Sequence, residues 1–76
     1  MLSPVQCKMA RAALGWTVKD LGRRAHVSAS SVVRFENDRH EANEATVLAM
    51  QRAFEDAGVR FTDDGGIVPP KKGVAE

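Results

Sequence analysis

The sequence predicts an all-α fold class in its main part, with four helices followed by a short C-terminal β-hairpin. Three observations predict it. Four segments each begin at a helix-capping residue and repeat apolar residues at helical spacing. After residue 58 the pattern changes to strand-like alternation. The chain has 76 residues, of which 43% are hydrophobic, and this suffices for one compact core.

Local signals delimit the first two helices, which we expect over about residues 3–14 and 18–25. Ser3 and Thr17 are capping residues, and each is followed three positions later by a residue that can complete a capping box. One face of the first helix is apolar apart from Arg11.

The third and fourth helices are expected over about residues 28–37 and 44–57. Ser28 caps the third helix after a connection of only about two residues. Asn43 caps the fourth helix, whose apolar residues recur at the spacing of a core stripe. These four helices make up a domain over residues 1–58.

Residues 59–68 alternate around an Asp-Asp-Gly-Gly turn and therefore indicate a hairpin. Such short strands leave an open edge, and pairing of that edge with a second copy would make a homodimer. The dimer interface would then contain Val59, Phe61, Ile67 and Val68. The alternative is that these side chains only cover the core of their own chain. Residues 69–76 are expected to form a disordered tail.

Composition excludes several classes of protein. The single cysteine, Cys7, rules out an internal disulfide, and the sequence has no metal-ligand spacing. It also lacks a nucleophile–base pair and a cofactor loop, so we expect no enzyme and no cofactor. Neither a membrane span nor a signal peptide is expected, which predicts a cytoplasmic protein.

Charge is distributed unevenly along the chain. The net charge is +1, but residues 1–40 carry +4 and residues 41–70 carry −4. A basic half is expected of a surface that faces DNA, opposite a solvated or partner-facing surface. Short chains also segregate charge by chance, so this signal alone leaves both interpretations open.

Residues 17–37 are the most informative part of the sequence. They contain two short helices, a tight connection and small residues on the facing stripe. This arrangement projects the N-terminal half of the helix at 28–37 outward, where it can enter a major groove. Further agreement comes from the segments 10–17, 21–28 and 32–37. Together they resemble the Cro/phage-repressor-type, xenobiotic-response-element-like family of helix-turn-helix regulators.

The resemblance covers roughly residues 3–58 and implies a lambda-repressor-like DNA-binding domain. It also implies roles for individual residues. Arg11 and Glu36 match a structural ion pair between the first helix and the end of the third. The residues expected to contact base edges are Ser28, Ala29, Ser30, Ser31 and Arg34. The residues expected to contact DNA phosphates are Thr17, Asn37 and Arg39.

Three positions depart from the family pattern. Val18 stands where the family often has a glutamine that anchors the DNA backbone. His26 stands where glycine is preferred because the connection often needs a positive φ. Gly22 replaces the commoner alanine, and this lowers helix propensity by about 1 kcal/mol.

We therefore expect a sequence-specific transcriptional regulator, a repressor of bacterial or phage origin that binds double-stranded DNA as a homodimer and is associated with the nucleoid. The alternative is an antitoxin or an adaptor that uses this fold to bind a protein partner without reading DNA. The acidic second half and Val18 favour the alternative. The salt dependence of binding distinguishes the two functions.

Overall fold

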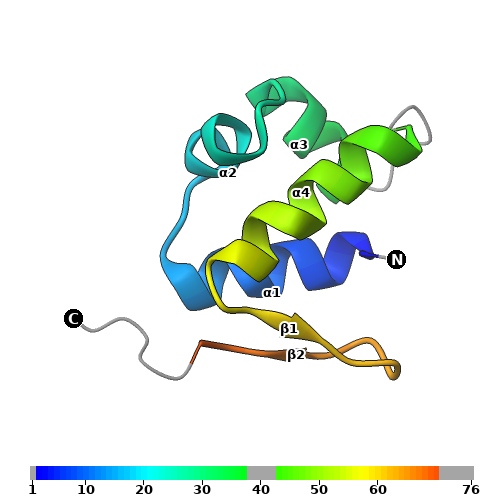
Figure 1. The fold of residues 1–76 in the computed structure, drawn as a ribbon. Coiled ribbons are helices and arrows are strands. Elements are labelled where there is room, and N and C mark those ends of the chain that lie inside the picture. The colour runs from blue at the N-terminus through cyan, green and yellow to red at the C-terminus, as the bar shows by residue number, and fades with distance from the viewer. Residues whose placement is uncertain (1, 38–42, 71–76) are drawn as a thin grey trace.

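The computed structural model describes residues 2–37 and 43–70, and it confirms the predicted fold class (Figure 1). The helices are α1 (Pro4–Leu14), α2 (Val18–Ala25), α3 (Ala29–Glu36) and α4 (Glu44–Asp56). The strands β1 (Arg60–Phe61) and β2 (Ile67–Val68) follow α4 as an antiparallel hairpin, below α1 in Figure 1.

A capping side chain precedes every helix. The caps are Ser3, Thr17, Ser28 and Asn43, and each accepts a hydrogen bond from the main-chain N–H three residues later. Ser3 and Thr17 take part in complete capping boxes. Gly15 ends α1 with a φ of 69°, a left-handed conformation that glycine adopts without strain. Local chemistry therefore determines where the helices begin.

The core lies where the four helices meet. Its buried hydrophobic residues are Leu2, Cys7, Ala10, Leu21, Ala25, Val32, Phe35, Val47, Met50, Ala53, Phe54 and Val59. Trp16 stacks on Phe54 with 5.6 Å between the ring centroids, and Phe54 meets Phe61 edge-on at 6.1 Å. These aromatic contacts join the connection after α1, helix α4 and the hairpin into one core.

Gln6 of α1 ties the hairpin to the helices. Its Nε2 donates to the carbonyl oxygen of Gly66 at 3.0 Å and lies 3.5 Å from that of Thr62. Its Oε1 accepts from the N–H of Ser3 at 3.0 Å. One buried amide thus serves both the cap of α1 and the turn of the hairpin, and this fixes the hairpin on its own chain.

The burial of the hairpin side chains corrects part of the expected dimer interface. Val59 is only 1% exposed, because it packs in the core of its own chain. It therefore has no surface to offer to a second copy. Phe61 and Ile67 are half-buried against the same core, whereas Val68 is 40% exposed.

The expectation that a disordered tail begins at residue 69 is also corrected. A Cβ built on Gly58 would lie 3.0 Å from the Cβ of Pro70, so this proline packs against Gly58, the second residue after α4. The chain thus folds back on itself as far as residue 70. The rest of the expected tail, 71–76, lies outside the described residues, as does the loop 38–42.

Candidate nucleic-acid interface

A tight turn joins α2 to α3. His26 ends α2 in the left-handed region, with φ 60° and ψ 40°. Its N–H donates to the carbonyl oxygen of Gly22, and so does the N–H of Val27, at 2.9 Å. The family resemblance implied a connection that often needs a positive φ, and histidine adopts it here at a steric cost that glycine would not have.

Gly22 lets the turn approach α2 closely. A Cβ at this position would lie 2.8 Å from the carbonyl oxygen of Val27 and 3.3 Å from the main-chain nitrogen of Ala29. Both are backbone atoms, so they cannot give way as a flexible side chain would. The absence of a side chain at residue 22 therefore fixes how closely the start of α3 packs on α2.

Helix α3 has an inner and an outer face. On the inner face Val32, Phe35 and Glu36 are buried. On the outer face the exposed residues are Ser28, Ser30, Val33, Arg34 and Asn37, and Ala29 and Ser31 are half-buried. The inner contacts hold the helix in place and leave its outer face to solvent.

The serines of this face differ in how free their hydroxyl groups are. The Oγ of Ser28 accepts from the N–H of Ser31 at 3.1 Å and shares a second hydrogen bond with the Oγ of Ser31 at 3.0 Å. Both groups are thus engaged in capping α3. The side chain of Ser30 makes no hydrogen bond to any other residue that the structure describes. Of the expected base-contacting residues, Ser30 and Arg34 are therefore the most available.

Val33 belongs to the same outer face, and the sequence analysis did not assign it a role. It is 43% exposed and lies beside Arg34 in the chain. Its position four residues after Ala29 was the available signal, because such residues share one face of a helix.

The N-terminus of α2 carries the predicted phosphate contact Thr17. Its Oγ1 accepts from the N–H of Asp20 at 3.0 Å, and its own N–H donates to Oδ2 of Asp20 at 2.9 Å. That N–H, with help from Arg23, holds the pKa of Asp20 below its ordinary range. The carboxylate of Asp20 is therefore an anion at this end of the helix. The exposed Lys19 in the same turn supplies a cation to which the sequence analysis gave no role.

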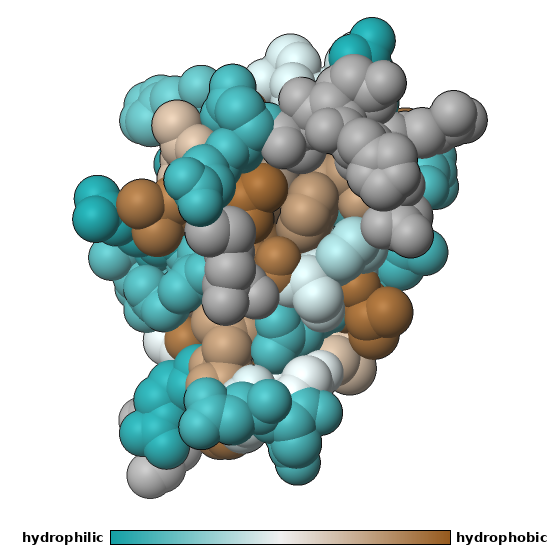
Figure 2. All heavy atoms as spheres, turned by 90° about the vertical axis from the view of Figure 1, so that its right-hand side faces the viewer, coloured by the Kyte–Doolittle hydropathy of each residue, from teal (hydrophilic) through white to brown (hydrophobic). Residues whose placement is uncertain are grey.

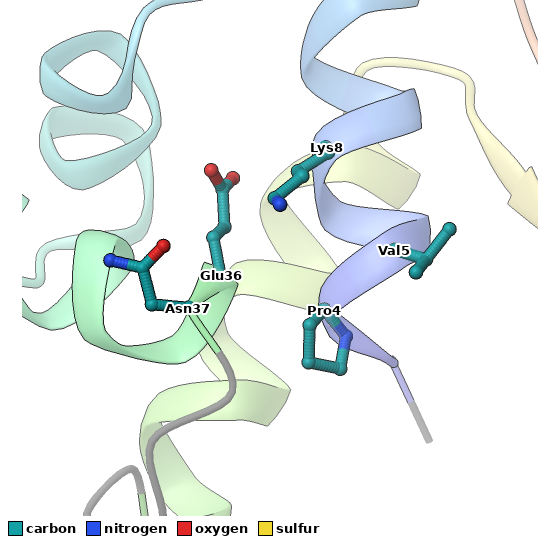
Figure 3. A pocket seen from close by; sticks show the side chains of 5 residues that line it. All are labelled: Pro4, Val5, Lys8, Glu36 and Asn37. Atoms are coloured by element: carbon teal, nitrogen blue, oxygen red, sulfur yellow. The ribbon is translucent and has the colours of Figure 1, made fainter.

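Asn37 and the start of α1 enclose an open pocket (Figure 3). Pro4, Val5 and Lys8 line its α1 side, and Glu36 and Asn37 line its α3 side. The amine of Lys8 points from α1 toward the side chain of Glu36. Asn37 is exposed at the end of α3, as a phosphate contact requires, while the expected contact Arg39 lies outside the described residues.

Arg11 and Glu36, which the resemblance pairs, are joined by two hydrogen bonds. Nε of Arg11 lies 2.7 Å from Oε2 of Glu36, and Nη2 lies 2.8 Å from Oε1. Nη1 donates to the carbonyl oxygen of Trp16 at 3.0 Å. Sγ of Cys7 donates to Oε2 at 3.0 Å, so this cysteine is more than a filler of the core. Burial, followed by the carboxylate of Glu36, raises the pKa of the Cys7 thiol, which keeps its proton.

Cations predominate on the exposed surface of the first three helices, and anions outnumber the exposed Arg52 and Arg60 on α4 and the hairpin. The exposed cations of the first three helices are Lys8, Lys19, Arg23, Arg24 and Arg34. The guanidinium of Arg24 also stacks on Trp16, 4.7 Å from the ring centroid. The exposed anions of α4 and the hairpin are Glu44, Glu55, Asp56, Asp63 and Asp64. Figure 2 shows a hydrophilic surface at the hairpin turn, at the bottom of the view.

The described residues contain neither a helix that could span a membrane nor a metal-binding cluster. None of the helices in the described part of the chain is long and apolar enough to cross a membrane. Within residues 2–37 and 43–70, no group of three or more histidine, cysteine or carboxylate side chains could hold a metal ion.

Comparison with known protein families gives a match over most of the chain. The model of a family described as a helix-turn-helix domain matches residues 6–59. The matched segment begins in α1, includes α2, the turn, α3 and α4, and ends just before β1. No curated protein matches the chain.

Proposed function

The chain belongs to the helix-turn-helix domain family, and from this premise we propose that it is a sequence-specific transcriptional regulator that places α3 in the major groove of double-stranded DNA. It acts in the cytoplasm as a repressor of bacterial or phage type. Regulation of this kind needs binding only, since an operator occupied by a repressor is closed to other proteins.

The outer face of α3 is the observation that carries this proposal. Ser30, Val33 and Arg34 are exposed there, and no hydrogen bond or ion pair to the rest of the described chain engages their side chains. Arg34 has the fork of donors that suits O6 and N7 of guanine. The buried inner face holds the helix rigid, so these groups are positioned before DNA arrives.

The charge distribution supports the orientation of the proposed complex. Exposed cations lie on α1, α2 and α3, and many of the exposed anions lie on α4 and the hairpin. DNA phosphates would be attracted to the first group and repelled by the second. We therefore assign Thr17, Lys19 and Asn37 to the DNA backbone and α4 to the side that faces away.

A selection from randomised DNA duplexes tests the function. The intact chain should enrich one motif, and Arg34→Ala should lose discrimination at one guanine at a cost of about 1–3 kcal/mol. Arg52→Ala is the matched control, because Arg52 is an exposed arginine of α4. The control should select the same motif as the unchanged chain. Failure of the intact chain to enrich any motif would refute the proposal.

A protein-binding adaptor or antitoxin is the second candidate. Asp20 favours it, because its carboxylate accepts a hydrogen bond from the N–H of Thr17 at the start of α2, a donor that a DNA phosphate would otherwise use. A salt titration separates the candidates. The DNA affinity of a regulator should fall steeply as the logarithm of the salt concentration rises, with a slope near the number of phosphate contacts. Binding of an adaptor to its protein partner need not respond in this way.

We further propose that the regulator is a homodimer that pairs through the outer edge of β1. The N–H of Thr62 donates to the carbonyl oxygen of Gly66 at 3.0 Å, so the next pair along the ladder, Phe61 and Ile67, is a non-hydrogen-bonded pair. The main-chain groups of both residues then point to the outer edges of the hairpin. Pro69 directly follows β2 and has no N–H to extend its edge, whereas an open hollow runs along β1.

A further inference from the structure

Val33 is an apolar residue that the core does not use. It is 43% exposed on a helix whose neighbouring residues 32, 35 and 36 are buried. Valine is also a weak helix former, because its branched side chain loses freedom against the preceding turn. Neither packing nor helix formation therefore explains a valine here.

The outer face of α3 contains two parallel strips. Residues four positions apart lie one above the other on a helix, so Ala29 and Val33 form an apolar strip and Ser30 and Arg34 form a polar one beside it. The members of each strip are about 6 Å apart along the helix axis, which is close to two base-pair steps of DNA. The two strips therefore reach the same few base pairs with different chemistry.

The apolar strip can distinguish only one feature of the major groove. Valine neither donates nor accepts a hydrogen bond, so it cannot read base edges by their polar atoms. Thymine alone among the standard bases presents a methyl group, on C5, in this groove. A cytosine or an adenine at the same place would instead put an amino group against the valine side chain, where it would lose its water without gaining a partner.

We propose that Val33 is a specificity-determining residue that reads the 5-methyl group of a thymine in the half-site where Arg34 reads guanine. This inference rests on the proposed DNA-binding function. Ala29, one turn earlier, has a single methyl group and is half-buried, so it contributes less at a position about two base pairs away.

The test replaces single thymines by deoxyuridine in a duplex selected with the intact chain, which removes a methyl group and leaves every hydrogen-bonding group in place. One replacement should weaken binding about fourfold for each half-site. Val33→Ala should bind the thymine duplex about fourfold or more weakly and should no longer respond to deoxyuridine at that position. Val33 is exposed and alanine is a better helix former, so the variant should fold.

Val5→Ala is the matched control, because Val5 is a valine of α1 that is 61% exposed. It should keep the full response to deoxyuridine. If the intact chain selects a motif but every thymine tolerates loss of its methyl group, or if Val33→Ala retains the response, the role of Val33 is refuted and the DNA-binding function stands. If the intact chain selects no motif, the DNA-binding function itself fails.

Discussion

Arg11 and Glu36 meet through two hydrogen bonds that join the last turn of α1 to the end of α3, with Nε–Oε2 and Nη2–Oε1 distances of 2.7 and 2.8 Å. The side chain of Glu36 is 6% exposed and that of Arg11 is 23% exposed. The pair therefore lies largely out of water, and it fixes the end of the helix whose outer face carries Ser30, Val33 and Arg34.

Removal of either partner should destabilise the domain strongly. In Arg11→Ala the carboxylate of Glu36 stays buried without its cation, and we expect a loss of about 3 kcal/mol in the free energy of unfolding. Thermal unfolding followed by circular dichroism should show a midpoint lower by about 12 °C or more. The double variant Arg11→Met/Glu36→Leu should recover most of the loss, because two apolar groups leave no buried charge. A single variant as stable as the unchanged chain would contradict a structural role for the pair.

The same pair predicts a loss of stability in acid. Burial by itself raises the pKa of Glu36, but hydrogen bonds from Arg11 and Cys7 and the nearby positive charges hold it below its ordinary value of 4.5. A carboxylate whose pKa is lower in the folded state stabilises fully above the unfolded value, and this stabilisation disappears as the pH falls through the folded value. In denaturant unfolding, the contribution of Glu36 to the free energy of unfolding should therefore be constant above about pH 5 and should decline below about pH 4.5.

Glu36→Gln is the comparison that isolates this effect. Asp20 and Asp64 also have lowered pKa values and remain in both proteins, so their contributions cancel. The difference in unfolding free energy between the two proteins should shrink as the pH falls. A difference that stays constant to about pH 2 would show that Glu36 does not titrate at a lowered pKa.

Much of the fold could be predicted because its signals are local. Capping side chains and apolar stripes act within a few residues, and they delimit the helices to within about two residues. Long-range contacts carry no such signal. Gln6 could be expected to close the cap of α1, but its bonds to residues 62 and 66 depend on the packing of the hairpin. The burial of Val59 also depends on packing, because alternation in a short strand does not show whether its own chain or a second copy covers the residue.

The features of the candidate site likewise fall into those that could be predicted from the sequence and those that could not. The outward-facing side of α3 and the pairing of Arg11 with Glu36 follow from spacing and family resemblance. The sequence could not show that Ser28 and Ser31 bind each other's hydroxyl groups, or that Cys7 donates to a carboxylate. These contacts depend on rotamers, which the spacing of residues does not determine.

Gly22→Ala should be harmful although alanine is the better helix former. The added Cβ would lie 2.8 Å from the carbonyl oxygen of Val27, so the turn and the start of α3 must move. Overpacking costs about 1–3 kcal/mol, against a gain of about 1 kcal/mol in helix propensity, so we expect a net loss of up to about 2 kcal/mol in stability. DNA affinity should fall as well, because α3 is displaced. Gly66→Ala, which would place a Cβ 3.1 Å from the hydroxyl oxygen of Thr62 in the hairpin, should leave DNA selection unchanged.

His26→Gly should stabilise the domain. His26 has a φ of 60°, and glycine adopts this conformation without the contact between Cβ and backbone. The side chain of His26 is exposed, so its loss costs no core packing. We expect a gain of about 0.5–1 kcal/mol in urea unfolding, reduced somewhat by the greater freedom of glycine in the unfolded chain. A destabilised variant would mean that the imidazole makes a contribution beyond its backbone conformation.

Pairing of β1 with β1 of a second copy predicts a dimer that depends on one N–H group. The chain has 76 residues, which is within reach of chemical synthesis, so the main chain can be altered without changing any side chain. N-methylation of Phe61 removes the donor at the outer edge of β1, and sedimentation at micromolar concentration should show a monomer. N-methylation of Ile67 makes the same change at the edge of β2 and should leave the dimer intact. Truncation after Gly58 is a poorer test, because it also removes Val59 from the core.

If the unchanged chain sediments as a monomer, or if N-methylation of Ile67 abolishes the dimer and that of Phe61 does not, then pairing through β1 is wrong. The two half-sites of an operator would in that case have to be bound by separate copies, and the affinity for a single half-site would equal that for the whole operator.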